Sequence, residues 1–315
     1  MLSALNIPLP AAAPNVKVLV RGWLNCNQIV INQPDDNVVI DAGYHAHSDA
    51  TLALLRTPEV GEKKNYSRLI NTHCHSDHMG GNAAIQRAFD CSIEVPIGES
   101  AGIRPWSRQS FWLDYADQYA EPFDYSAIIS PGEILRLGGA EWRAVASPGH
   151  DMGALMFYCA EHRLLISGDA LWHNGLGAIT PKEGTNPGVE SALQTLQTIR
   201  EMDVGTVIPG HGKPFTDVDA ALARAESRLN AYAADPRKSA RNFLKSIFTF
   251  HLLEIGAMPL DEVADYLARV PCYVDINADF FRLAPGALAD LLISELLAVD
   301  AVKIEQRKVY PTMAV

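Results

Sequence analysis

Thr72-His73-Cys74-His75-Ser76-Asp77-His78-Met79-Gly80-Gly81 is the stretch that decides the fold, because it places three histidines and one carboxylate within six residues. Histidines two apart in an extended segment point to the same side, so His73 and His75 can hold one metal ion together. The turn that follows brings Asp77 and His78 beside the first pair, where a second ion could bind. The spacing H-x-H-x-D-H therefore predicts a metal-dependent enzyme.

Short apolar runs on both sides of this stretch end in a residue that can bind metal. Each run predicts a buried strand that delivers one side chain from the loop at its end. Glycine or proline stands at most of these junctions, as expected where the backbone bends tightly around a site. The five runs end at Asp41, His73, His150, Asp169 and His211.

In the order and separation of these residues, the chain resembles the metallo-β-lactamase-fold hydrolase superfamily over roughly residues 17–214. The resemblance implies that the first metal ion is held by three histidines and the second by an aspartate and two histidines, with one aspartate bridging the two ions. In this sequence those ligands are His73, His75 and His150, then Asp77, His78 and His211, then the bridging Asp169. Asp41 resembles the family's carboxylate that orients ligand histidines without binding metal.

A set of imidazole and carboxylate ligands without thiolate suits two divalent ions. We expect zinc, with manganese or iron as alternatives, because these ligands do not select sharply among the three. A paired site activates water at neutral pH, and a hydroxide bridging the two ions would attack a carbonyl or phosphoryl centre. The candidate catalytic residues are Asp169 and Asp77, of which Asp77 is first a ligand and second a group that orients the hydroxide.

The expected fold is α/β: a four-layer αββα sandwich with a small, mainly helical C-terminal domain. The catalytic domain would span residues 1–235 and carry an aromatic cap inserted at about residues 98–130. The boundary falls at Asp235-Pro236. Residues 236–315 read as helices from Ser239 to about Glu254, from Leu260 to Val270 and from Pro285 to Val299, followed by a short extended tail, an order that resembles a winged-helix appendage. Before the boundary, Leu155–Cys159 is expected to be a strand and Val218–Ala234 a long surface helix.

Composition narrows the partners. The formal net charge is -11, and residues 238–315 hold eight Lys/Arg against ten Asp/Glu. Both counts disfavour a nucleic-acid partner, because a phosphate-binding face should be basic. Five scattered cysteines suit a reducing cytoplasm. No apolar run approaches the ~18 residues of a membrane helix, and residues 1–14 lack the pattern of a secretory signal. We expect a cytoplasmic protein without a membrane partner, in which the C-terminal domain packs over the site or forms a homodimer.

The predicted cap is rich in aromatic residues, which suggests an apolar wall near the metal ions. The alternative is that these rings only pack the cap against the sandwich. Two further residues soon after Asp169 are expected to rim the cavity. The candidate pocket residues are Trp106, Phe111, Trp112, Tyr115, Trp172 and His173.

The leading functional hypothesis is hydrolysis of a thioester or related carbonyl ester of a small or medium acyl substrate. Lactone hydrolysis is the nearest alternative, because the same attack serves both bonds. Phosphodiester cleavage by a nuclease-like enzyme, and iron-dependent redox chemistry of the persulfide dioxygenase kind, remain as different classes. True β-lactamases typically have cysteine or serine in the second metal site, where this chain has Asp169, so antibiotic hydrolysis is disfavoured.

Overall fold

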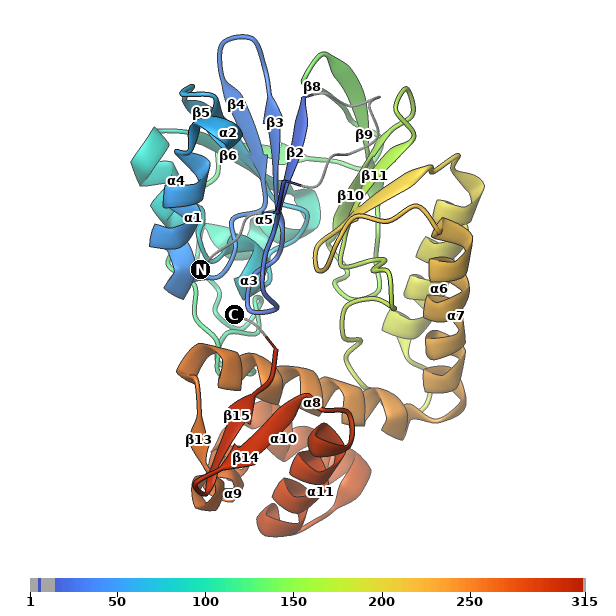
Figure 1. Cartoon of the computed structure of the whole chain (residues 1–315). Coiled ribbons are helices and arrows are strands. Elements are labelled where there is room, and N and C mark those ends of the chain that lie inside the picture. Colours follow the sequence, from blue (N-terminus) through green and yellow to red (C-terminus); the bar gives the residue numbers. More distant parts are fainter. Residues whose placement is uncertain (1–4, 7–14, 314–315) are drawn as a thin grey trace.

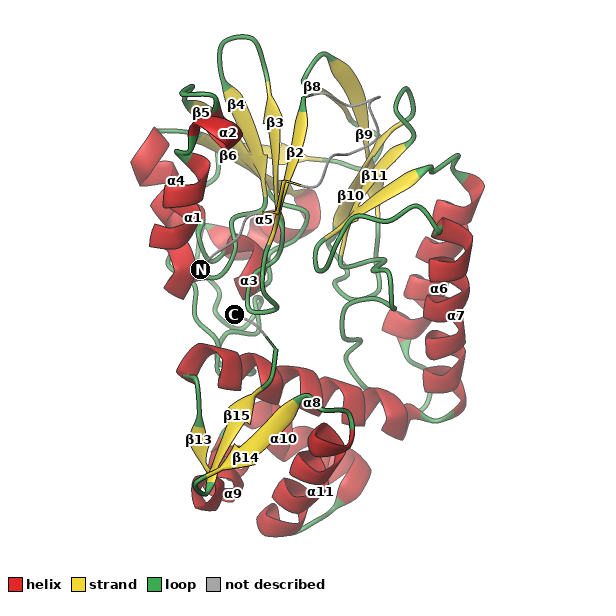
Figure 2. Cartoon of the chain, in the orientation of Figure 1, coloured by secondary structure: helices red, strands yellow, loops and turns green. Residues whose placement is uncertain are grey.

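The computed structural model describes residues 5–6 and 15–313 and shows two β-sheets packed face to face (Figures 1 and 2). The first sheet has seven strands in sequence order, and β4 to β7 run parallel. Its strands are β1 (Leu5–Asn6), β2 (Val16–Val20), β3 (Gln28–Asn32), β4 (Asn37–Ile40), β5 (Tyr66–Ile70), β6 (Ser92–Pro96) and β7 (Ala127–Ile129).

The second sheet has five strands in the order β12-β11-β10-β9-β8. Within it β11 and β12 are parallel, and the other neighbours are antiparallel, so β9, β11 and β12 all run in the same direction. Its strands are β8 (Ile134–Leu137), β9 (Ala140–Ala146), β10 (Leu155–Cys159), β11 (Leu164–Gly168) and β12 (Thr206–Pro209).

Successive side chains of a strand point to opposite faces of the sheet, so a strand that is covered on both faces is buried at every position. In β10, Leu155, Phe157 and Cys159 face the core between the two sheets, whereas Met156 and Tyr158 face the outer helices. Every residue of β10 is therefore buried. The chain thus forms four layers, with helices outside each sheet.

Helices cover the outer face of each sheet (Figure 1). Apolar residues of several short helices pack against the first sheet in one core, and apolar residues of two long helices pack against the second sheet in another. The covering helices are α1 (Ser48–Leu55), α2 (Pro58–Gly61), α4 (Asn82–Phe89) and α5 (Ile97–Ile103) on the first side, and α6 (Pro187–Glu201) and α7 (Val218–Ala234) on the second. The short α3 (Ser76–Met79) lies within the histidine-rich stretch. This arrangement confirms the predicted αββα sandwich.

A helical C-terminal region with its own apolar core lies below the sandwich in Figure 1. It begins directly after Asp235, whose carboxylate accepts a hydrogen bond from the N–H of Arg237 (3.1 Å) and caps the first helix. Its elements are α8 (Pro236–Ile255), β13 (Met258–Pro259), α9 (Val263–Arg269), α10 (Pro271–Ile276), α11 (Pro285–Ala298), β14 (Val302–Glu305) and β15 (Lys308–Pro311). The strands form a three-stranded sheet in the order β13-β15-β14.

Helix α8 is the element of this region that matters most for the site, because it runs beneath the loops at one edge of the sandwich (Figure 1). Among the described residues, no helix is both long and apolar enough to cross a membrane.

Candidate metal centre and its cavity

The site is assembled from loops that leave strands at one edge of the sandwich. Strands β4 and β5 of the first sheet and β9, β11 and β12 of the second all run toward this edge. The loops after β5, β9, β11 and β12 carry the seven predicted ligands, and the structure brings all seven together, whereas the loop after β4 carries Asp41. Each of three triads holds its ligand atoms within 4.8 Å of one another: His73, His75 and His150; His73, His78 and Asp169; and Asp77, His78 and His211.

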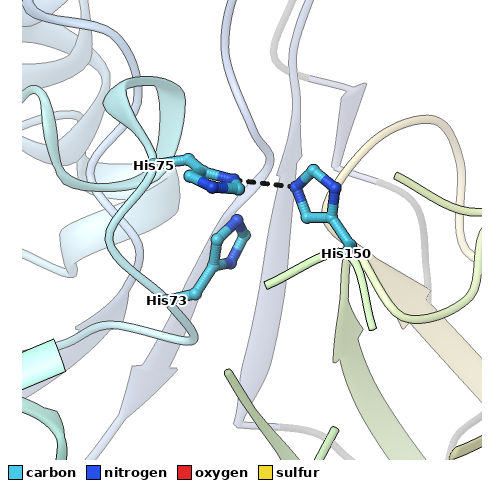
Figure 3. A group of neighbouring side chains, drawn as sticks. All are labelled: His73, His75 and His150. Carbon is cyan, nitrogen blue, oxygen red and sulfur yellow. Dashed lines mark hydrogen bonds between the residues drawn. The ribbon is translucent and has the colours of Figure 1, made fainter. Parts of the chain in front are cut away.

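The first triad consists of three imidazole rings that converge from two loops (Figure 3). Nδ1 of His75 lies 2.8 Å from Nε2 of His150. The other ring nitrogen of His150, Nδ1, donates a hydrogen bond to the carbonyl oxygen of Ala178 (2.6 Å). That bond fixes the tautomer of His150 and leaves Nε2 free to act as a ligand.

The triad of Asp77, His78 and His211, called the second triad from here on, is joined to the first by Asp169. Nε2 of His211 lies 3.0 Å from Oδ2 of Asp77. The two carboxylate oxygens of Asp169 face both groups of histidines: Oδ1 is 3.3 Å from Nε2 of His78, and Oδ2 is 3.4 Å from Nε2 of His150. This position between the two groups is the one that a bridging ligand needs.

Asp41 contacts one of the ligands, His78, and the adjacent Thr72. Its carboxylate accepts hydrogen bonds from the N–H of Thr72 (2.8 Å), the hydroxyl of Thr72 (2.8 Å) and Nδ1 of His78 (2.9 Å). Its backbone has a φ of 60°, in the left-handed region that aspartate and asparagine tolerate better than most residues. The bond to Nδ1 leaves Nε2 of His78 directed at the other ligands.

Two buried nitrogen atoms test whether these residues fit a metal ion. Nε2 of His73 and Nε2 of His78 are buried, and neither has a hydrogen-bond partner among the described residues. A buried polar atom without a partner is costly, and metal coordination would remove that cost. The orphaned nitrogens therefore fit coordination of a metal ion.

The electrostatics of the site favour the ligand forms of His73 and Asp169, whereas at His78 burial is outweighed by Cys26 and the surrounding carboxylates, which raise the pKa of that ring well above its usual range. Burial holds the pKa of His73 well below its usual range, so the ring is neutral, as a ligand must be. Burial opposes ionisation of Asp169, but nearby His78 and His211 outweigh it and hold the pKa of that carboxyl well below its usual range.

A cavity of about 980 Å³ opens beside the ligands and extends to α8. Its walls include Trp23, whose ring stacks on His211 at a centroid distance of 5.5 Å, and Trp172, whose indole N–H donates to Oδ1 of Asp169 (3.1 Å). The volume lies at the upper end of the ~300–1,000 Å³ typical of ligand pockets.

The six predicted pocket residues divide into two groups of three. Phe111, Trp112 and Trp172 line the cavity. Trp106, Tyr115 and His173 are not among the described residues that line it. Trp106 packs on Phe111 inside the core of the first sheet, Tyr115 packs on Trp112 beside the C-terminal core, and His173 faces Asp217. Of the four cap residues in this set, Phe111 and Trp112 line the cavity, whereas Trp106 and Tyr115 pack against the neighbouring cores.

Several residues near the ligands gave no recognisable signal in the sequence. Asp151 follows His150 directly, and its Oδ2 lies 3.6 Å from Nε2 of His75. Glu99 is buried beside Asp151, and burial together with that neighbouring carboxylate raises the pKa of Glu99 to about 9. For Asp151, the only indication in the sequence was its position directly after the ligand His150. Glu99 and Trp23 are distant from the ligands in the sequence and lie near them only because the chain folds.

Comparison with known proteins agrees with this geometry. The model of the metallo-beta-lactamase superfamily matches residues 21–211. A hydroxyacylglutathione hydrolase of Hyphomonas neptunium is 29% identical over 171 residues, which cover 51% of this chain and 57% of the relative. One of Bdellovibrio bacteriovorus is 27% identical over 146 residues, which cover 46% of this chain and 49% of the relative. The chain spans about half the length of these curated relatives.

Solved structures share the fold. A metallo-beta-lactamase family protein from Thermus thermophilus has a TM-score of 0.57 and 17% identity, and the match covers 96% of this chain and 100% of that one. The FEZ-1 metallo-beta-lactamase from Legionella gormanii has the same TM-score and identity and covers 74% of this chain and 99% of its own. The chain belongs to the metallo-beta-lactamase superfamily, and its clustered histidines and aspartates form groups that could hold metal ions.

Proposed function

We propose that this protein is a metal-dependent hydrolase of carbonyl esters, and of thioesters above all. The observation that carries the proposal is the position of Asp169, which faces histidines of both triads and lines a cavity large enough for an organic substrate. The curated relatives support the choice of bond, because they are named for hydrolysis of an acylglutathione, which is a thioester.

In this proposal the first ion is held by His73, His75 and His150, the second by Asp77, His78 and His211, and both by Asp169. Two divalent ions in such a site supply Lewis acidity and lower the pKa of a coordinated water toward ~7. Zinc is the expected metal, and manganese or iron would also fit these ligands.

The remaining residues position and shield the reacting groups. Asp41 and the carbonyl of Ala178 hold His78 and His150 with their ligand nitrogens directed inward. The indole N–H of Trp172 holds the carboxylate of Asp169 from the cavity side. Trp23, stacked on His211, covers the second triad and limits the access of water to it.

A panel of substrates tests the proposal. Zinc-loaded protein would be offered acyl thioesters, lactones and a phosphodiester, each beside a control stripped by a chelator. Chelator-sensitive thioester cleavage is expected. Cleavage of lactones alone would move the assignment to the lactonase alternative, and cleavage of the phosphodiester alone would overturn the carbonyl assignment. Oxygen consumption by iron-loaded protein without hydrolysis would overturn the hydrolase assignment.

A further inference from the structure

One wall of the cavity comes from the C-terminal region. Asn242, Ser246, Phe250 and Leu253 of α8 all line the cavity. Their spacing of three or four residues places them on one face of the helix. From Asn242 to Leu253 this face is about 16 Å long, at ~1.5 Å per residue. The helix therefore offers a binding surface longer than the metal centre itself.

The first half of this face carries the polar side chains Asn242 and Ser246, with Phe243, Lys245 and Ile247 beside them in the cavity wall, and lies on the His150 side of the site. The carbonyl of Ala178 accepts a hydrogen bond from His150, and the neighbouring carbonyl of Ile179 accepts one from the hydroxyl of Ser239 near the start of α8 (3.0 Å). Asn242 and Ser246 follow on the next turns. The loop that contacts His150 therefore rests on the polar half of α8.

The second half is apolar and lies on the His211 side. The ring of Phe250 meets that of Tyr44 edge-on at a centroid distance of 5.1 Å. Leu253 packs with Tyr44 and Leu24 in a small buried cluster. Trp23, the neighbour of Leu24 in the chain, stacks on His211 and lines the same cavity. An apolar pocket wall thus begins beside the second triad and continues along α8.

We propose that this apolar half of α8 binds the acyl group, so that the substrates are thioesters with an extended apolar acyl chain. The inference rests on the proposed function and adds the substrate class to it. A carbonyl placed at the ligands would direct its apolar part toward Phe250 and Leu253 and its polar carrier toward Asn242 and Ser246. A two-carbon acyl group would leave the apolar half empty, and empty apolar surface contributes nothing to binding.

Binding of uncleavable thioethers tests this without requiring turnover. Zinc-loaded protein would be titrated calorimetrically with S-octyl- and S-ethyl-N-acetylcysteamine, which share one neutral carrier. Each buried methylene strengthens binding roughly fourfold, so burial of only two gives the octyl ligand a preference of about tenfold or more. Equal affinities for the two ligands would overturn the proposal.

Variants of α8 locate the effect. Phe250→Asn should reduce the octyl preference by about fivefold or more, because it places an amide in the apolar half. Ile255→Asn is the matched control, since Ile255 is exposed on the same helix outside the cavity, and it should keep the full preference. Ser246→Phe, at an exposed position of the polar half, should weaken both ligands alike. Loss of the preference in Ser246→Phe, or its full retention in Phe250→Asn, would overturn the assignment.

The two proposals fail separately. If the protein prefers the octyl ligand but cleaves no thioester, the proposed hydrolase function is wrong, whereas the binding of apolar chains by this half of α8 is supported. Cleavage of acetyl and octanoyl thioesters at equal efficiency, with equal binding of the two thioethers, would keep the function and overturn the inference.

Discussion

Replacement of Asp41 by asparagine tests how the protein holds a ligand histidine in place. The carboxylate of Asp41 is buried and accepts three hydrogen bonds, two from Thr72 and one from Nδ1 of His78. Asparagine tolerates the left-handed backbone that Asp41 adopts (φ 60°), so the change leaves the turn itself unstrained. The amide oxygen can still accept from the N–H of Thr72, and the Thr72 hydroxyl can rotate to accept from the new NH₂ group.

The donor left without a partner is Nδ1–H of His78. Loss of one hydrogen bond to a charged acceptor costs about 1.5–3 kcal/mol, so the free energy of unfolding of the metal-free protein should fall by roughly that amount. Loss of a partner that orients a ligand typically weakens metal binding by about 10–100-fold. The second ion, which His78 would bind, should therefore be lost first.

Two assays measure these effects on Asp41→Asn. Urea unfolding of the metal-free protein reports the stability change, and competition against a chromophoric chelator reports the zinc affinity. Asp35→Asn, on the exposed turn between β3 and β4, is the control and should match the parent in both. Unchanged zinc affinity in Asp41→Asn would refute the role assigned to this carboxylate.

Three single side chains give further predictions. Asp169→Ala should loosen both ions and abolish turnover, because its two oxygens face both triads; normal metal content with a normal rate would exclude a bridging role. Trp112→Ala should lower the melting temperature, because the ring packs 6.3 Å from that of Phe243, and should also alter the preference among acyl groups; a change of melting temperature alone would mean that the ring only packs. Glu99→Gln should gain stability relative to the parent as pH rises from about 5 to about 9, at up to ~1.4 kcal/mol per pH unit. Burial and the carboxylate of Asp151 raise the pKa of Glu99 to about 9, so ionisation opposes folding in that window, and urea unfolding of both proteins across it should show a difference that grows with pH.

The sandwich and the convergence of the ligands were predictable because the decisive signals are local. A buried strand followed by a histidine or an aspartate can be read within ten residues, and the parallel direction of such strands brings their ends to one edge. The strand at Leu155–Cys159 and the helix at Val218–Ala234 have the predicted bounds. At α8 the predicted start was Ser239, whereas the helix begins at Pro236, because Asp235 caps it and proline suits the first helical turn.

The walls of the cavity were less predictable because they depend on contacts distant in the sequence. The density of aromatic residues between positions 98 and 130 was visible, but not which rings face the cavity. Trp106 and Trp112 both have a positive φ, and that local backbone geometry redirects each side chain in a way that no period in the sequence reveals. The predicted helix at 260–270 contains a short 3-10 turn, Leu260–Glu262, ahead of α9. The approach of α8 to the ligands depends on the docking of the whole C-terminal region.

The central claim is that seven side chains from four loops form a two-metal hydrolytic site. The most direct test is to titrate zinc into chelator-stripped protein while bound metal and thioester turnover are followed in the same sample. The account predicts that about two ions bind per chain and that turnover appears only as they bind, as expected for a paired site. Full turnover in the metal-free protein would contradict the account. Failure of the protein to bind zinc when zinc is in large excess would contradict it as well.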